Sequence, residues 1–191
     1  MKTYRLSAAG RRNVLVLLVA ALLIWVFAFW SFASTLRISY NPVRFWASLQ
    51  ESLAQGLSVG QVVPALLMLV LIVATPLLIW ALLAEWAAAY TPTPDGLRFE
   101  TLGVRVVCPW HCVRGMRPVD ADADEPFDEL LLDSDPATQT GHPLTRFLHR
   151  QAWGADRLPI YPDLEERDEL LAAIRGALEA ASRAEHASAP A

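Results

Sequence analysis

The chain has 191 residues, 54% of them apolar, and a formal net charge of −4; its mean hydropathy of +0.30 is high for a soluble domain. The charge is uneven, because residues 1–12 carry four cations and no acid, whereas the chain from Tyr90 onward has a net charge of −8. An acidic domain repels phosphate backbones, so we expect no nucleic-acid partner.

Residues 1–12 form a basic N-terminus, and two uncharged apolar runs follow it at 13–36 and 62–84. A hydrocarbon core of roughly 30 Å needs about 20 helical residues, so each run is long enough to span a bilayer. The length of the first run favours an uncleaved helix over a signal peptide. We therefore predict a membrane helical hairpin with transmembrane helices at 13–36 and 62–89.

The orientation of the hairpin follows from its flanking charges. Arg11 and Arg12 abut the first span, whereas the loop between the spans holds only Arg37 and Arg44. The positive-inside rule then places the N- and C-termini in the cytoplasm, with the connecting loop outside. Fifteen Arg against one Lys are typical of a GC-rich bacterial genome. These observations predict a two-pass protein of the bacterial inner (cell) membrane.

Aromatic and proline residues mark both spans. Tryptophans such as Trp25 sit well at the headgroup level of a bilayer, so we interpret most of them as interfacial anchors. Pro64 falls in the first turn of the second predicted helix, where a missing N–H is harmless, and Pro76 falls in its interior and predicts a kink.

The outer loop at 37–61 contains a further helical pattern. Asn41-Pro42 provides a cap and a first turn, and the apolar residues that follow recur at helical spacing. We expect an amphipathic helix that lies flat in the outer interface, with a partner-binding face as the alternative. The apolar stripe consists of Phe45, Trp46, Leu49, Leu53 and Leu57.

The cytoplasmic domain is expected at 90–183, with a disordered tail at 184–191. After a turn at Thr93-Pro94-Asp95-Gly96, β-like runs occur at 97–101, 104–108, 113–119, 129–133 and 157–161. A helix follows at 163–183, capped by Asp163, and its apolar stripe includes Leu171 and Ile174. Strands closed by one amphipathic helix predict an α+β domain, with Leu171 and Ile174 in its core.

Three motifs in this domain resemble a known family. They are Thr-Pro-Asp-Gly-Leu at 93–97, Val-Cys-Pro-Trp-His-Cys-Val at 107–113, and Leu-Pro-Ile-Tyr-Pro at 158–162 before the terminal helix. With two preceding spans, this arrangement resembles the bacterial membrane proteins that carry a PH-like domain. The resemblance implies a small PH-like β-barrel or sheet capped by a C-terminal helix, with Pro109 and Trp110 in its core. The family usually has two acidic residues after the Trp, where this chain has His111 and Cys112.

Two patterns invite a metal-binding interpretation and fail to meet its requirements. Cys108 and Cys112 would lie about 13 Å apart in a strand, too far for one metal or a disulfide, so we expect free cysteines. The run at 120–124 begins like a calcium loop, but Glu125 stands where Gly is needed. We predict no catalytic residue, no metal ligand and no cofactor.

Four arginines in the early strands offer a basic surface. Arg98, Arg105, Arg114 and Arg117 either face lipid headgroups or balance local acids. Because the domain contains no Lys and is net acidic, we predict that residues 90–191 alone do not bind anionic headgroups.

The function that these patterns favour is non-enzymatic. We expect a PH-like module that binds a protein partner or a second copy of the chain, or that rests against the lipid bilayer as a scaffold. The alternative is an accessory subunit of a larger membrane complex. A small enzyme or metal-dependent sensor is disfavoured, because no ligand or catalytic set is present in the sequence.

Overall fold

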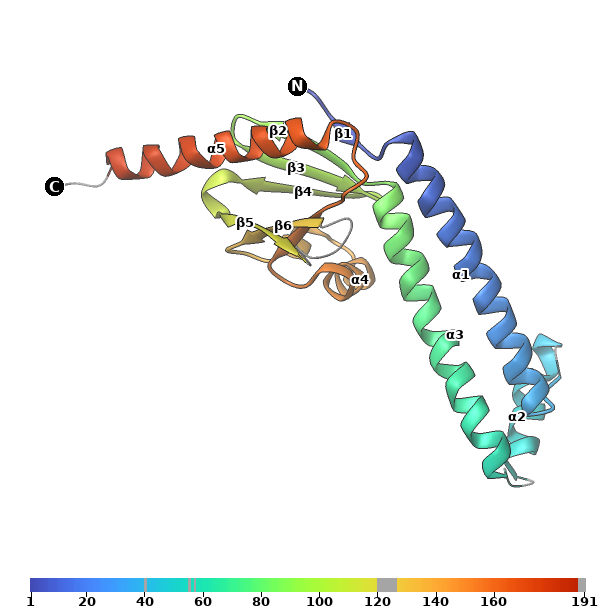
Figure 1. Ribbon diagram of the computed structural model, residues 1–191. Helices are drawn as coiled ribbons and strands as arrows, with labels where there is room; N and C mark the ends of the chain where they lie inside the picture. Colours follow the sequence, from blue (N-terminus) through green and yellow to red (C-terminus); the bar gives the residue numbers. More distant parts are fainter. Residues whose placement is uncertain (40, 55, 57, 120–126, 189–191) are drawn as a thin grey trace. The chain divides into compact units, whose positions relative to one another are not determined.

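The computed structural model describes residues 1–39, 41–54, 56, 58–119 and 127–188, with the backbone alone at 42, 53 and 184–188. The chain divides into two compact units (Figure 1). One consists of Leu15–Trp80 and is helical, and the other combines Met1–Val14 with Ala81–Ala191 and contains the sheets.

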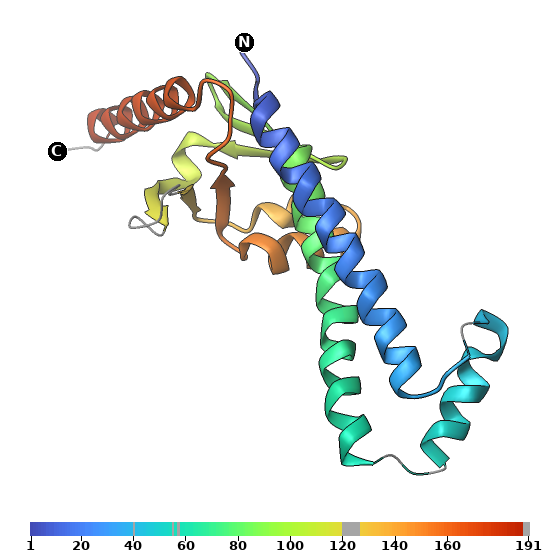
Figure 2. The ribbon, with the colours of Figure 1, turned by 45° about the vertical axis from the view of Figure 1, so that its right-hand side comes forward.

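The helical unit is a hairpin of two long helices, α1 (Ala8–Thr35) and α3 (Val59–Trp86). Both are long and apolar enough to cross a membrane, as a two-pass membrane protein requires. Figure 2 shows them side by side, with α2 (Pro42–Ala54) in the connection. The predicted hairpin is confirmed, although α3 ends at Trp86 and does not reach residue 89.

The two long helices are joined by a hydrogen bond at the interior proline. Pro76 lacks an N–H, so the carbonyl of Ile72, four residues earlier, has no partner within α3. The indole N–H of Trp25 on α1 donates to that carbonyl at 3.1 Å. Trp25 therefore serves as an interhelical donor, a role that our interpretation of it as an anchor did not foresee. Because α3 begins at Val59, Pro64 lies beyond its first turn.

The predicted amphipathic helix is present as α2. The side chain of Asn41 accepts a hydrogen bond from the N–H of Val43 at 3.0 Å, which confirms the cap. Phe45 and Leu49 pack against a buried cluster formed by the end of α1, the residues after it and Ala65 of α3. Trp46, by contrast, is exposed. The side chain of Leu53 and the whole of Leu57 lie outside the described residues.

The other unit contains two antiparallel sheets and a C-terminal helix, which confirms the α+β prediction. The described strands form one sheet in the order β1-β2-β3-β4 and a second in the order β5-β6-β7. Their bounds are β1 (Tyr4–Arg5), β2 (Ala89–Thr93), β3 (Gly96–Thr101), β4 (Val104–Pro109), β5 (Val113–Val119), β6 (Phe127–Leu132) and β7 (Arg157–Ile160).

The sequence reasoning did not predict β1 and β2, and their pairing changes the domain organisation. Tyr4 pairs with Tyr90 and Arg5 with Ala89, so the whole hairpin is inserted between two neighbouring strands of one sheet. An isolated bridge between Leu6 and Leu164 extends this contact. Residues 1–12 are therefore part of the sheet domain and the start of α1, and not the separate basic segment that we predicted.

The helices of this unit also differ from expectation. The carbonyl of Asp163 accepts a hydrogen bond from the N–H of Ser7 at 2.9 Å, and α5 (Arg167–Ser188) begins only after Glu166, whose φ is +53°. Asp163 is thus not the cap of this helix. Because α5 continues to Ser188, the predicted disordered tail is helical over most of its length. The polar connection after β6 contains the unpredicted helix α4 (Pro143–Trp153).

The core of the unit lies between its sheets and α5. The hydroxyl of Tyr90 on β2 donates to the carbonyl of Pro159 on β7 at 2.6 Å, which links the two sheets. Phe99 meets the ring of Trp153 edge-on at 5.7 Å between centroids. Alternation along β4 buries one face and exposes the other, as expected for a sheet with one face in a core. Fully buried apolar residues include Leu97, Val106, Leu130, Leu158, Ile160, Leu170 and Ile174.

Candidate functional site

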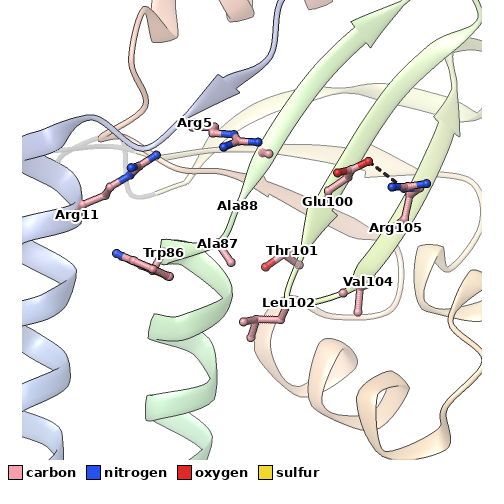
Figure 3. Close-up of a pocket in the computed structure, with 12 residues that line it drawn as sticks. Arg5, Arg11, Trp86, Ala87, Ala88, Glu100, Thr101, Leu102, Val104 and Arg105 are labelled. Atoms are coloured by element: carbon pink, nitrogen blue, oxygen red, sulfur yellow. Dashed lines mark ion pairs between the residues drawn. The ribbon is translucent and has the colours of Figure 1, made fainter.

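A cavity of about 600 Å³ lies beside Trp86, the last residue of α3. Figure 3 shows its lining, which comes from β1, the start of α1, the end of α3 and the hairpin that joins β3 to β4. All of these residues belong to the sheet-containing unit. The volume falls within the range of small-molecule sites.

The turn at the tip of the β3–β4 hairpin is unusual in its sequence. Leu102 and Gly103 both have positive φ, +39° and +77°, as a type I′ turn requires. The first of these positions normally takes Asn, Asp or Gly, because a branched apolar residue is strained there. In this chain the position is occupied by Leu102, whose side chain is 36% exposed. A strained residue of this kind persists only where the surrounding structure holds it.

A buried hydrogen bond fixes this hairpin to the end of α3. The hydroxyl of Thr101 donates to the carbonyl of Ala84 at 2.5 Å, and both residues are almost fully buried. The carbonyl of Ala84 is one of those that a helix leaves free in its last turn, so Thr101 also caps α3. Leu102 is thereby held beside the end of the helix that carries Trp86.

The cavity has a basic lining. Arg5, Arg11 and Arg105 line it together with one acidic residue, Glu100, whose carboxylate is paired with Arg105 at 2.8 Å. No ion pair involves Arg5 or Arg11 in the part of the chain that the structure describes. Guanidinium groups from separate elements around one cavity are suited to binding an anion.

The four arginines singled out in the sequence do not form one cluster. Arg98 and Arg105 both pair with Glu100 on the first sheet. On the second sheet, Arg114 pairs with Asp133 and Arg117 pairs with Glu129. Each of the four therefore balances a local acid, and only Arg105 reaches the cavity.

The expected core residues lie near one another. Trp110 is buried in the short 3₁₀ turn η1 (Trp110–Cys112), and its indole N–H donates to the carbonyl of Thr93 at 3.0 Å. Pro109 ends β4 and is half-buried. Leu171 and Ile174 are both buried on α5, which packs against η1.

The two cysteines lie closer together than a continuous strand would place them. The chain turns at η1, so Cys108 on β4 and Cys112 line the same small cavity, and both are free thiols. Burial raises the pKa of the Cys108 thiol to about 12, which makes it a poor nucleophile and metal ligand. No group of three metal-ligating side chains occurs among the described residues. The calcium-like run at 120–124 lies outside them.

One buried histidine has a strongly shifted pKa. His149 on α4 is 1% exposed, its ring lies edge-on to Trp153 at 4.1 Å, and its Nε2 has no partner within the described structure. Burial lowers the pKa of His149 to about 4, although the nearby carboxylate of Asp135 opposes the shift. His149 is therefore a neutral core residue at physiological pH.

Sequence reasoning missed Arg5 and Arg11 as site residues, because it used the basic N-terminus only to orient the spans. A signal was present in the alternation of Tyr4, Arg5 and Leu6. The first and third of these are buried and the second is exposed, as in a half-buried strand.

Comparisons with known proteins add no family or function. No protein-family model, curated protein or solved structure matches this chain.

Proposed function

We propose that this chain is a non-enzymatic protein of the bacterial inner membrane whose PH-like domain is held against the cytoplasmic bilayer surface as a scaffold for a protein partner. The insertion of the apolar hairpin between β1 and β2 carries this proposal. The sheet is attached to both ends of the hairpin, so the domain is tied to the membrane at two neighbouring points.

The PH-like assignment has support in the strand arrangement. The described strands form a four-stranded and a three-stranded antiparallel sheet, and a long helix follows them. This supports the small β-barrel or sheet with a C-terminal helix that the sequence resemblance implies. β1 supplies an edge strand of that arrangement from the far side of the hairpin.

Contact of the domain with the bilayer has support in Trp86 and Leu102. Trp86 ends an apolar helix and is exposed, and indole rings at such positions favour the headgroup level. Leu102 presents a strained, exposed apolar side chain and lines the same cavity. An apolar turn tip beside an interfacial Trp is suited to resting in the headgroup layer.

The test compares the two ends of one strand. A spin label at Leu102→Cys marks the end of β3 beside Trp86, and one at Asp95→Cys marks the exposed turn at its other end, about 20 Å away. The native Cys108 and Cys112 are replaced in both variants. In liposomes we expect the label at 102 to be more accessible to oxygen than to a water-soluble nickel complex, and the label at 95 to show the reverse. Equal water accessibility at both positions would contradict the proposal.

Purification from native membranes separates the scaffold from the accessory-subunit alternative. A scaffold migrates on a native gel as a small oligomer with a substoichiometric partner. A stoichiometric set of other membrane subunits would favour the alternative.

A further inference from the structure

The unpaired arginines of the cavity are the starting point. Most arginines on the sheets form an ion pair with a neighbouring carboxylate. Arg98 and Arg105 share Glu100, and the two arginines on β5 pair with Asp133 and Glu129. Arg5 and Arg11 have no carboxylate partner in the described part of the chain, although the unit that contains them is rich in acids. Both side chains are exposed, and two cations without a carboxylate partner at one cavity favour an anion as its ligand.

The two side chains converge on the cavity from different elements. Arg5 lies on β1 opposite Ala89, and Arg11 lies near the start of α1. Figure 3 shows them on one side of the cavity, with Trp86 below and the Glu100–Arg105 pair on the other side. The strand pairing of β1 and the close approach of Gly10 to Asp163 fix the backbone that carries both arginines. The fold thus positions the backbone of both residues at the cavity, and their side chains are exposed.

We propose that this cavity binds the phosphate group of an anionic phospholipid, with Arg5 and Arg11 as its principal ligands. A guanidinium fork matches phosphate geometry and makes charge-assisted hydrogen bonds to its oxygens. Three arginines against one carboxylate favour a lipid with net negative charge over a zwitterionic one. The inference rests on the proposed function, because it takes Trp86 to lie at the headgroup level.

The site also agrees with the prediction that residues 90–191 alone do not bind anionic headgroups. Both principal ligands lie before the first span, in β1 and α1. A fragment that begins at residue 90 lacks them and retains only Arg105, which Glu100 already balances.

The experiment uses the full chain in a neutral detergent with added phosphatidylglycerol or phosphatidylcholine. Lipid retention is measured by native mass spectrometry, and affinity by thermal-shift titration. We expect selective retention of phosphatidylglycerol, and a loss of affinity of at least about tenfold in Arg5→Gln/Arg11→Gln, because each charged hydrogen bond is worth about one order of magnitude or more. Arg12→Gln is the matched control, since Arg12 is exposed on the same helix and does not line the cavity.

The outcomes separate a specific site from general attraction. Equal losses in Arg5→Gln/Arg11→Gln and Arg12→Gln would overturn the proposal, as would equal retention of the two lipids. A melting temperature of the double variant close to the wild-type value, measured without lipid, shows that folding is intact. Should the double variant fail to fold, Arg5→Lys/Arg11→Lys tests whether the guanidinium geometry is needed. An affinity of this variant for phosphatidylglycerol equal to that of the wild type would overturn the proposal.

Two further arms identify the source of the phosphate. Oleate is anionic and carries no phosphate, so oleate that binds as tightly as phosphatidylglycerol would overturn the phosphate assignment. Glycerol phosphate that binds as tightly as the lipid would assign the site to a free phosphate ester and overturn the lipid assignment. The result is independent of the spin-label test, because selective lipid binding in detergent does not require Leu102 to contact a bilayer.

Discussion

The indole N–H of Trp25 donates to the carbonyl of Ile72, the acceptor that Pro76 leaves without a helical partner. An unsatisfied carbonyl in the hydrocarbon region is costly, so a helix with an interior proline needs an outside donor. Trp25 supplies that donor from the neighbouring helix, and the proline and the tryptophan therefore act as a pair.

The first prediction is a double-mutant cycle on this pair. Trp25→Phe should destabilise the hairpin by about 0.6 kcal/mol, the average for interhelical hydrogen bonds in membranes, and by no more than about 1.7 kcal/mol. In a Pro76→Ala background the same substitution should cost much less, because residue 76 then supplies its own N–H. Reversible unfolding in mixed micelles measures both values. Trp30→Phe is the control, since Trp30 is exposed and makes no hydrogen bond in the described structure, and equal effects at the two positions would refute the pairing.

The second prediction concerns two helical glycines with opposite surroundings. A Cβ at Gly10 would lie 2.6 Å from the Cβ of Asp163, whereas a Cβ at Gly176 would meet nothing within 4 Å. Gly10→Ala should destabilise the protein by about 1–3 kcal/mol through overpacking. Gly176→Ala should stabilise it by about 0.5–1 kcal/mol through helix propensity. Thermal unfolding in detergent measures both, and stabilisation by Gly10→Ala would show that α1 does not approach Asp163.

The third prediction concerns the buried face of α5. Leu171 is buried, whereas its neighbour Ala172 is exposed. Leu171→Asp loses about 2–5 kcal/mol of packing and also buries a charge, so the domain should unfold. Ala172→Asp should change stability by less than about 0.5 kcal/mol. Limited proteolysis reports on both, and a protease-resistant Leu171→Asp protein would mean that this face is not part of the core.

The fourth prediction is a pH dependence of stability from His149. Its pKa is about 4 in the folded state against 6.5 in an unperturbed chain, so the unfolded state binds more protons between these pH values. The free energy of unfolding should therefore fall as the pH decreases from 6.5 to 4. In urea titrations at several pH values, His149→Gln should show a shallower fall of stability than the wild type. Identical slopes in the two proteins would argue against a buried, neutral His149.

The fifth prediction concerns topology. Gln50 on α2 and Ser182 on α5 are both exposed. With the native cysteines replaced, an impermeant thiol reagent applied to intact cells should label Gln50→Cys and spare Ser182→Cys, because the positive-inside rule predicts that α5 is cytoplasmic. Labelling at 182 would reverse the orientation.

The sequence predicted best those elements whose signals are long or local. Each long helix shows an apolar run that is long enough to cross a membrane, and Asn41-Pro42 marks the start of α2 by a cap that the structure contains. Five strands were also predictable, because alternation and turns define them over several residues. Their bounds differ from those predicted by only a few residues.

The missed elements depend on weaker or distant signals. β1 is only two residues long, and its partner lies beyond both spans, so the short alternation at Tyr4–Leu6 is the one local signal of a strand there. The helix α4 carries Pro143 in its first turn and Gly154 with φ +91° after its end, a pair of signals that would have identified it. The candidate cavity is lined in part by Arg5 of β1, so it could not be predicted without the pairing of β1 with β2.

The pairing of β1 with β2 also orders the events of biosynthesis. β1 precedes both apolar helices in the chain and β2 follows them, so β1 has no partner until the whole hairpin has been synthesised. If only one helix crossed the bilayer, the two strands would be left on opposite sides of it, and Tyr4 could never reach Tyr90. The sheet then closes only in chains that cross the membrane an even number of times. A chain that failed to complete this edge would leave the N–H and C=O groups of one strand unpaired, as at any exposed sheet edge.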